Sequence, residues 1–86
     1  MRKHTPDFTF TKNDEITCVE VEMTQKSKTR LFNIIKDNFM DYDNQIWIVP
    51  DSQTVIYQTL KENQKFYTNI HIMSLKEITD YFHQIK

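Results

Sequence analysis

Three acidic side chains near the N-terminus are the residues of this chain best suited to chemistry. Asp7 follows Pro6, and Glu20 and Glu22 lie two positions apart in a segment rich in β-branched residues. Alternate residues of a strand point to the same side of a sheet, so Glu20 and Glu22 share a face with Cys18. Neighbouring carboxylates repel each other, and a hard divalent cation relieves that repulsion because it prefers oxygen ligands. We therefore expect a site for Mg²⁺ or Mn²⁺ at Asp7, Glu20 and Glu22.

Basic residues follow directly after this acidic segment. Lys26 and Lys28 are placed to stabilise the charge that develops on a phosphate. Together with Arg30 and Lys36 they form a local basic group, which suits contact with the phosphates of a nucleic acid. The formal net charge of the chain is −1, so no global basic field accompanies this group. A solvated helix face is the alternative interpretation of the same four residues.

The glutamates and the remaining reactive side chains also have structural interpretations. Alternating Glu20 and Glu22 suit the solvated outer face of a two-layer protein, with no site at all. Cys18 is the only cysteine, which excludes an intramolecular disulfide and favours a buried, inert thiol. The three histidines are far apart in sequence and show no metal-ligand spacing.

Hydrophobic periodicity predicts the elements that position these residues. Strand patterns at 8–11 and 16–23 are separated by four polar residues, which predicts an antiparallel hairpin. Helical spacing follows over 24–40, with Thr24 or Ser27 as the N-cap. The apolar run ending at Pro50 predicts a strand covered on both faces.

The second half of the chain predicts two further helices and one more strand. The second helix is expected over about 52–65, capped by Asp51 or Ser52, and the last strand over 69–73. Ser74 and Glu77 form a capping box for a C-terminal helix. The apolar stripe of that helix is expected to cover the sheet or to form a dimer contact. The stripe consists of Leu75, Ile78, Phe82 and Ile85.

This order predicts an α/β fold with a mixed sheet of about four strands, in which an antiparallel hairpin precedes a β-α-β-α-β-α run. The 86 residues suit a single domain over 1–86. The first strand is expected at an exposed edge, where pairing with a second copy would give a homodimer.

Composition removes several classes of function. The chain has no glycine, which excludes a Walker A loop, a dinucleotide-binding fingerprint and a nucleophile elbow. No stretch approaches the roughly 18 apolar residues of a membrane span, and nothing after Met1 resembles the apolar core of a signal peptide. Residence in the cytoplasm is therefore expected.

The segment Pro6-Asp7, twelve residues, then Glu20-Val21-Glu22 resembles the PD-(D/E)xK motif of the restriction-endonuclease-like superfamily. With the residues up to Leu31 and the Ile46–Pro50 run, it is similar to the nuclease-like domain of replication-relaxation and mobilisation proteins of plasmids and other mobile elements. The resemblance implies DNA as substrate or ligand, with Asp7, Glu20, Glu22 and Lys26 as catalytic residues. It further implies contacts with DNA from Lys26, Lys28 and Arg30.

The chain departs from this family pattern in two ways. Glu22 stands where the family usually has lysine, and Lys26 or Lys28 is expected to substitute. The family core normally has a helix and a strand before the Pro-Asp strand, so we expect a truncated core. Two functions remain open: metal-dependent hydrolysis of phosphodiesters, and an inactive module that associates with itself or with a larger replication or mobilisation protein.

Overall fold

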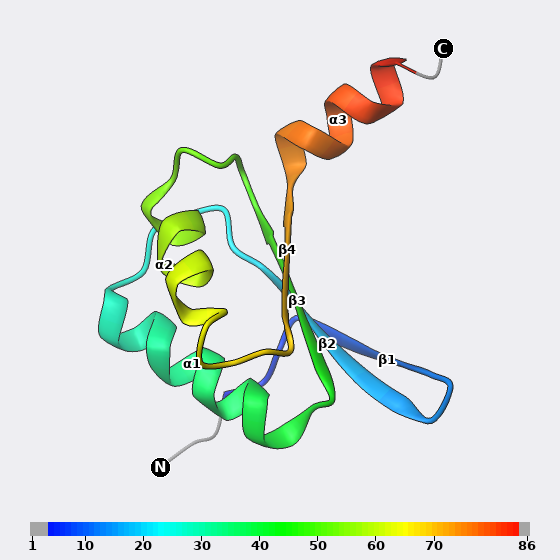
Figure 1. Ribbon diagram of the computed structural model, residues 1–86, viewed down its shortest axis with the longest axis vertical. Coiled ribbons are helices and arrows are strands. Elements are labelled where there is room, and N and C mark those ends of the chain that lie inside the picture. The colour runs from blue at the N-terminus through cyan, green and yellow to red at the C-terminus, as the bar shows by residue number, and fades with distance from the viewer. Residues whose placement is uncertain (1–3, 85–86) are drawn as a thin grey trace.

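The computed structural model describes residues 4–84 and contains a four-stranded sheet with three helices. Strand β1 pairs antiparallel with β2, whereas β2, β3 and β4 are parallel, in the spatial order β1-β2-β3-β4 (Figure 1). This confirms the predicted mixed α/β sheet with β1 at an edge. The elements are β1 (Phe8–Lys12), β2 (Glu15–Val21), α1 (Lys28–Asp41), β3 (Asn44–Val49), α2 (Val55–Asn63), β4 (Ile70–Ser74) and α3 (Leu75–Gln84).

The hairpin between β1 and β2 turns on two residues without a glycine. Lys12 pairs with Glu15, so only Asn13 and Asp14 form the loop. Both have positive φ angles, 52° and 65°. Asn and Asp tolerate this left-handed conformation better than other residues with a side chain. The turn is therefore tighter than the four-residue connection that the sequence predicts.

Side-chain caps set where the first two helices begin. Ser27 Oγ accepts a hydrogen bond from the Arg30 amide at the start of α1, which confirms one of the two predicted caps. Helix α2 begins at Val55, because Thr54 Oγ1 accepts from the Tyr57 amide. The predicted cap at Asp51 or Ser52 is wrong. The Asp51 carboxylate instead accepts from the Gln53 amide two residues on, which forms a turn before the helix.

The core lies between one face of the sheet and the helices α1 and α2. Along β3, Gln45, Trp47 and Val49 are fully buried, whereas Ile46 and Ile48 are half-buried on the other face. The prediction that β3 is covered on both faces is therefore wrong, since α1 and α2 lie on the same side of the sheet (Figure 1). The core cluster consists of Leu31, Ile34, Ile35, Trp47, Val49, Ile56, Leu60 and Ile70.

Helix α3 does not cover the sheet as expected. None of its described residues is buried, and it projects beyond the end of β4, away from α1 and α2 (Figure 1). Leu75 begins α3 directly after the last residue of β4, Ser74, whose Oγ accepts from the Glu77 amide as the capping box predicts. A chain that reverses onto its own sheet needs connecting residues, commonly two to six. This junction has none. Ile85 of the predicted stripe lies outside the described residues.

Within residues 4–84, no helix has the length and apolar character needed to cross a membrane.

Candidate functional site

Glu20 of β2 and Glu22, which follows the last residue of β2, are both buried on the helix-covered side of the sheet. Only 5% of Glu20 and 8% of Glu22 is exposed. The interpretation of these glutamates as a solvated outer face is therefore wrong. Burying a carboxylate is costly unless partners compensate its charge, so their neighbours decide what the pair can do.

Two side chains from distant segments hold Glu20. Asn38 of α1, which is 1% exposed, donates from Nδ2 to Glu20 Oε2 over 2.9 Å. His4 Nε2 lies 2.6 Å from the same oxygen. Neither residue was expected as a partner of Glu20, because neither shares an element or a spacing motif with it. One signal in the sequence points to Asn38. It falls at helical spacing from Leu31, Ile34 and Ile35, which places it on the buried face of α1.

Glu22 is held by an ion pair with a residue of the following loop. Lys26 Nζ lies 3.1 Å from Glu22 Oε2. Both side chains are largely shielded from solvent, with 21% of Lys26 and 10% of Glu22 exposed. Lys26 therefore lies beside Glu22 and balances its charge.

Asp7 is exposed and caps the edge of the hairpin. Its Oδ2 accepts from the Val21 amide over 2.6 Å, just beyond the paired residues Phe8 and Val19. Each of the three predicted metal ligands thus has a different partner within the protein. In the part of the chain that the structure describes, no three acidic, histidine or cysteine side chains are grouped closely enough to hold a metal ion. As arranged, these carboxylates do not fit a shared three-ligand site.

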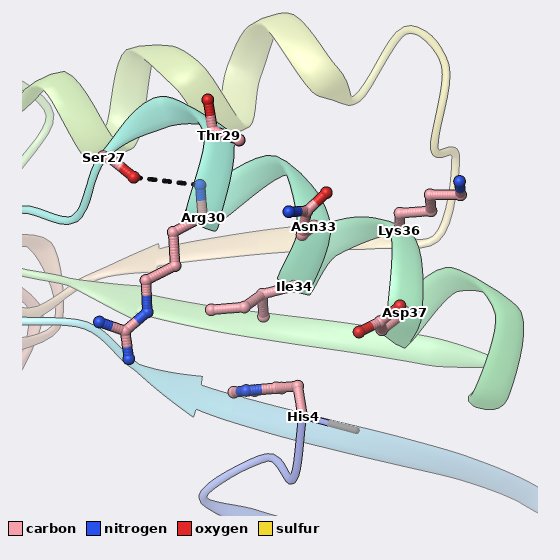
Figure 2. Close-up of a pocket in the computed structure, with 8 residues that line it drawn as sticks. All are labelled: His4, Ser27, Thr29, Arg30, Asn33, Ile34, Lys36 and Asp37. Carbon is pink, nitrogen blue, oxygen red and sulfur yellow. Dashed lines mark hydrogen bonds between the residues drawn. The ribbon is translucent and has the colours of Figure 1, made fainter. Parts of the chain in front are cut away.

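A hollow of about 600 Å³ lies beside α1, and its lining includes His4, the residue that contacts Glu20. Arg30 reaches into it from α1, and His4 extends toward the same space from the N-terminal segment (Figure 2). Lys36 lies at the end of this hollow away from Arg30, next to Asp37 (Figure 2). We call this feature the α1 hollow. Its lining consists of His4, Ser27, Thr29, Arg30, Asn33, Ile34, Lys36 and Asp37.

Only two of the four residues of the predicted basic group line the α1 hollow. Arg30 and Lys36 line it, whereas Lys28 is exposed outside the lining and Lys26 is paired with Glu22. His4 lines the hollow and contacts Glu20. A buried carboxylate is thereby connected, through one imidazole ring, to a cavity that carries two cationic side chains.

Cys18 shares the face of the glutamates and is fully buried. Burial and, to a lesser extent, the charge of Glu20 raise the pKa of the Cys18 thiol from 9.0 to about 12. The thiolate is the reactive form of cysteine, so the raised pKa favours an unreactive thiol. The predicted burial of Cys18 is confirmed.

Alkylation of Cys18 by iodoacetamide at about pH 8 is expected to be at least 100-fold slower in the native chain than in urea, because thiolate and access are both lost on folding. Mass spectrometry follows the reaction. The native thiol binds its proton more tightly than the unfolded one, so its contribution to stability is complete below pH 9.0 and is lost toward about pH 12. A Thr11→Cys, Cys18→Ser chain, with an exposed thiol on β1, is the reactive control. Equal labelling of the two native proteins would contradict the prediction.

The structure therefore pairs Glu20 with His4 and Asn38 and pairs Glu22 with Lys26. It leaves Asp7 at the hairpin edge and Lys28 outside the lining of the α1 hollow. Comparisons of the chain with family models, with curated proteins and with solved structures found no match.

Proposed function

We propose that this chain is a nuclease-like DNA-binding domain that holds the sugar-phosphate backbone in the α1 hollow. The observation that carries the proposal is the placement of Arg30 and His4 on one cavity, with His4 contacting the buried Glu20. The resemblance to replication-relaxation and mobilisation proteins supports DNA as the ligand. The domain would then serve the replication or mobilisation of a mobile element in the cytoplasm, alone or within a larger protein.

The lining of the α1 hollow is suited to phosphate. A guanidinium group offers several donors in a planar fork that matches phosphate oxygens, so Arg30 is the principal anchor. Hydroxyl and amide side chains commonly add contacts to phosphates, and Ser27, Thr29 and Asn33 supply them here. Asp37 at the Lys36 end repels a phosphate, which favours binding at the Arg30 end. A local site of this kind does not need a basic net charge.

His4 adds a titratable side chain to the α1 hollow, next to the proposed position of the sugar-phosphate backbone. The ring lies against a carboxylate that Asn38 also holds, and a paired carboxylate is a common way to orient an imidazole for proton transfer. The metal-dependent hydrolysis implied by the resemblance is not part of the proposal, because Asp7, Glu20 and Glu22 each have another partner.

Fluorescence anisotropy with labelled single-stranded and duplex oligonucleotides tests the proposal. Arg30→Glu is expected to weaken binding about tenfold or more and to reduce the slope of log Kd against log salt by about one. Lys65→Glu, the same charge change at an exposed position outside the α1 hollow, is the matched control and is expected to change little. Absence of binding by the unmodified chain, or equal losses in both variants, would contradict the proposal.

The same oligonucleotides, incubated with Mg²⁺ or Mn²⁺, show whether the function extends to cleavage. Cleavage that is lost in Glu20→Gln and retained in Lys65→Glu would add hydrolysis to the proposed binding. Binding without cleavage is the result that the present arrangement of Asp7, Glu20 and Glu22 favours.

A further inference from the structure

The face of the sheet opposite α1 and α2 is apolar and has no helix packed on it among the described residues. Phe8 is 53% exposed, Phe10 43%, Val21 41% and Met73 43%. The strand register makes this surface continuous, because Val21 pairs with Ile48 and Ile48 with Met73. We call it the open face. It consists of Phe8, Phe10, Thr17, Val19, Val21, Ile46, Ile48, His71 and Met73, of which Thr17 and Val19 are buried.

Helix α3 carries an apolar stripe that is not packed on a sheet. Leu75 is 45% exposed, Tyr81 60% and Phe82 57%, and none of the helix's described residues is buried. An apolar groove of about 370 Å³ lies where α3 leaves β4, next to the open-face residue Met73. Its lining consists of Ile72, Met73, Ser74, Glu77, Ile78, Tyr81 and Phe82.

We propose that two copies of this chain form a two-fold dimer in which α3 of each copy packs on the open face of the other. Each chain carries one uncovered sheet face and one helix without a sheet, and α3 follows β4 without a connecting residue that would let it fold back. Reciprocal exchange of the two surfaces closes the assembly at two copies.

The dimensions of the two surfaces agree. Helix α3 has ten residues and is therefore about 15 Å long. The distance from the first to the last of four neighbouring strands is about 14 Å. One helix of this length covers the width of the open face.

The available area suits a stable dimer. Phe8, Phe10, Tyr81 and Phe82 each expose about half of their surface, which gives roughly 400 Å² of aromatic area per copy. A standard interface buries about 800 Å² per partner, so these four residues supply about half of it. Val21, Met73, Leu75 and Ile78 contribute to the remainder.

The charge pattern of the strands favours burial of the open face. Lys12 and Glu15 are the basic and acidic strand residues whose positions in the alternation place them on the open face. They pair beside the hairpin turn. The rest of the open face carries only His71 as a titratable group, so covering it removes little charge from water. The α1 hollow lies on the other side of the sheet and stays accessible, which makes the dimer independent of the proposed function.

Sedimentation velocity over a range of concentrations tests the dimer with two pairs of variants. Phe82→Glu on α3 and Phe10→Glu on the open face are each expected to weaken dimerisation at least about tenfold. Gln84→Glu on the polar side of α3 and Thr11→Glu on the opposite face of β1 are the matched controls. All four side chains are exposed, so the circular dichroism spectrum is expected to be unchanged.

Mixing the two defective variants tests which surfaces meet. In a mixed dimer, α3 of the Phe10→Glu copy and the open face of the Phe82→Glu copy are both unmodified, so one complete contact is restored. The mixture is therefore expected to contain more dimer than either variant alone. A monomeric unmodified chain, a dimer insensitive to Phe82→Glu, or no recovery on mixing would overturn the proposal; the second result would instead indicate pairing through the exposed edge of β1.

Discussion

Asn38→Asp is expected to lower the free energy of unfolding by about 4 kcal/mol at neutral pH. Asn38 is 1% exposed and donates to the buried Glu20 carboxylate over 2.9 Å. The substitution keeps the shape of the side chain, removes the donor and places a second carboxylate against the first. Urea denaturation followed by tryptophan fluorescence measures the loss, because Trp47 lies in the same core.

The pH dependence of this variant identifies the cause. Two carboxylates in contact share a proton, which raises the pKa of the pair above the unfolded values. The folded variant then binds protons that the unfolded chain releases, so its deficit is largest at neutral pH and shrinks as the pH falls toward about 5. A deficit that is constant with pH would show that packing, and not repulsion from Glu20, is responsible.

Asn33→Asp is the matched control for this variant. Asn33 lies on the same helix and is exposed, so the same change there is expected to alter stability by less than about 0.5 kcal/mol. Equal losses at the two positions would contradict the assignment of Asn38 as the partner of Glu20.

Lys26→Met is expected to lower the free energy of unfolding by about 3 kcal/mol, because it leaves the buried Glu22 carboxylate without its cation. The long methionine side chain retains most of the packing of the lysine stem. Lys28→Met, which removes the same charge from an exposed position two residues on, is expected to have almost no effect. Urea denaturation compares the two variants, and equal stability of the two would contradict a structural role for the Lys26–Glu22 pair.

The Lys26→Met variant also tests the expectation that the acidic residues bind a divalent cation. Without Lys26, the acidic group has one uncompensated charge, and a bound divalent cation would stabilise the folded chain by mass action. Restoration of stability by millimolar Mg²⁺ or Mn²⁺, lost again in a Glu20→Gln background, would support an ion at the acidic pair. If neither ion changes the stability of the Lys26→Met variant, no cation takes the place of Lys26. Lys26 is then the partner of Glu22 in the unmodified chain.

Several local features follow from short-range sequence alone. The alternation along 16–23 places Cys18, Glu20 and Glu22 on one face of β2, since the side-chain period of a strand is two. Ser27 begins α1 because its hydroxyl is spaced to accept the Arg30 amide. The second helix is harder to place: Asp51 and Ser52 are the expected caps, whereas Thr54 caps the helix and the Asp51 carboxylate accepts from the Gln53 amide.

The order of strands and helices, the mixed sheet and the shared face of the two glutamates follow from periodicity and from neighbours within a few positions. Long-range packing places α1 over that shared face, brings His4 and Asn38 to Glu20 across 16 and 18 residues, and leaves α3 free of its own sheet. Periodicity specifies which side chains point the same way, but it does not specify what covers them. That depends on contacts between distant segments and on whether a junction such as Ser74–Leu75 leaves the chain room to turn back.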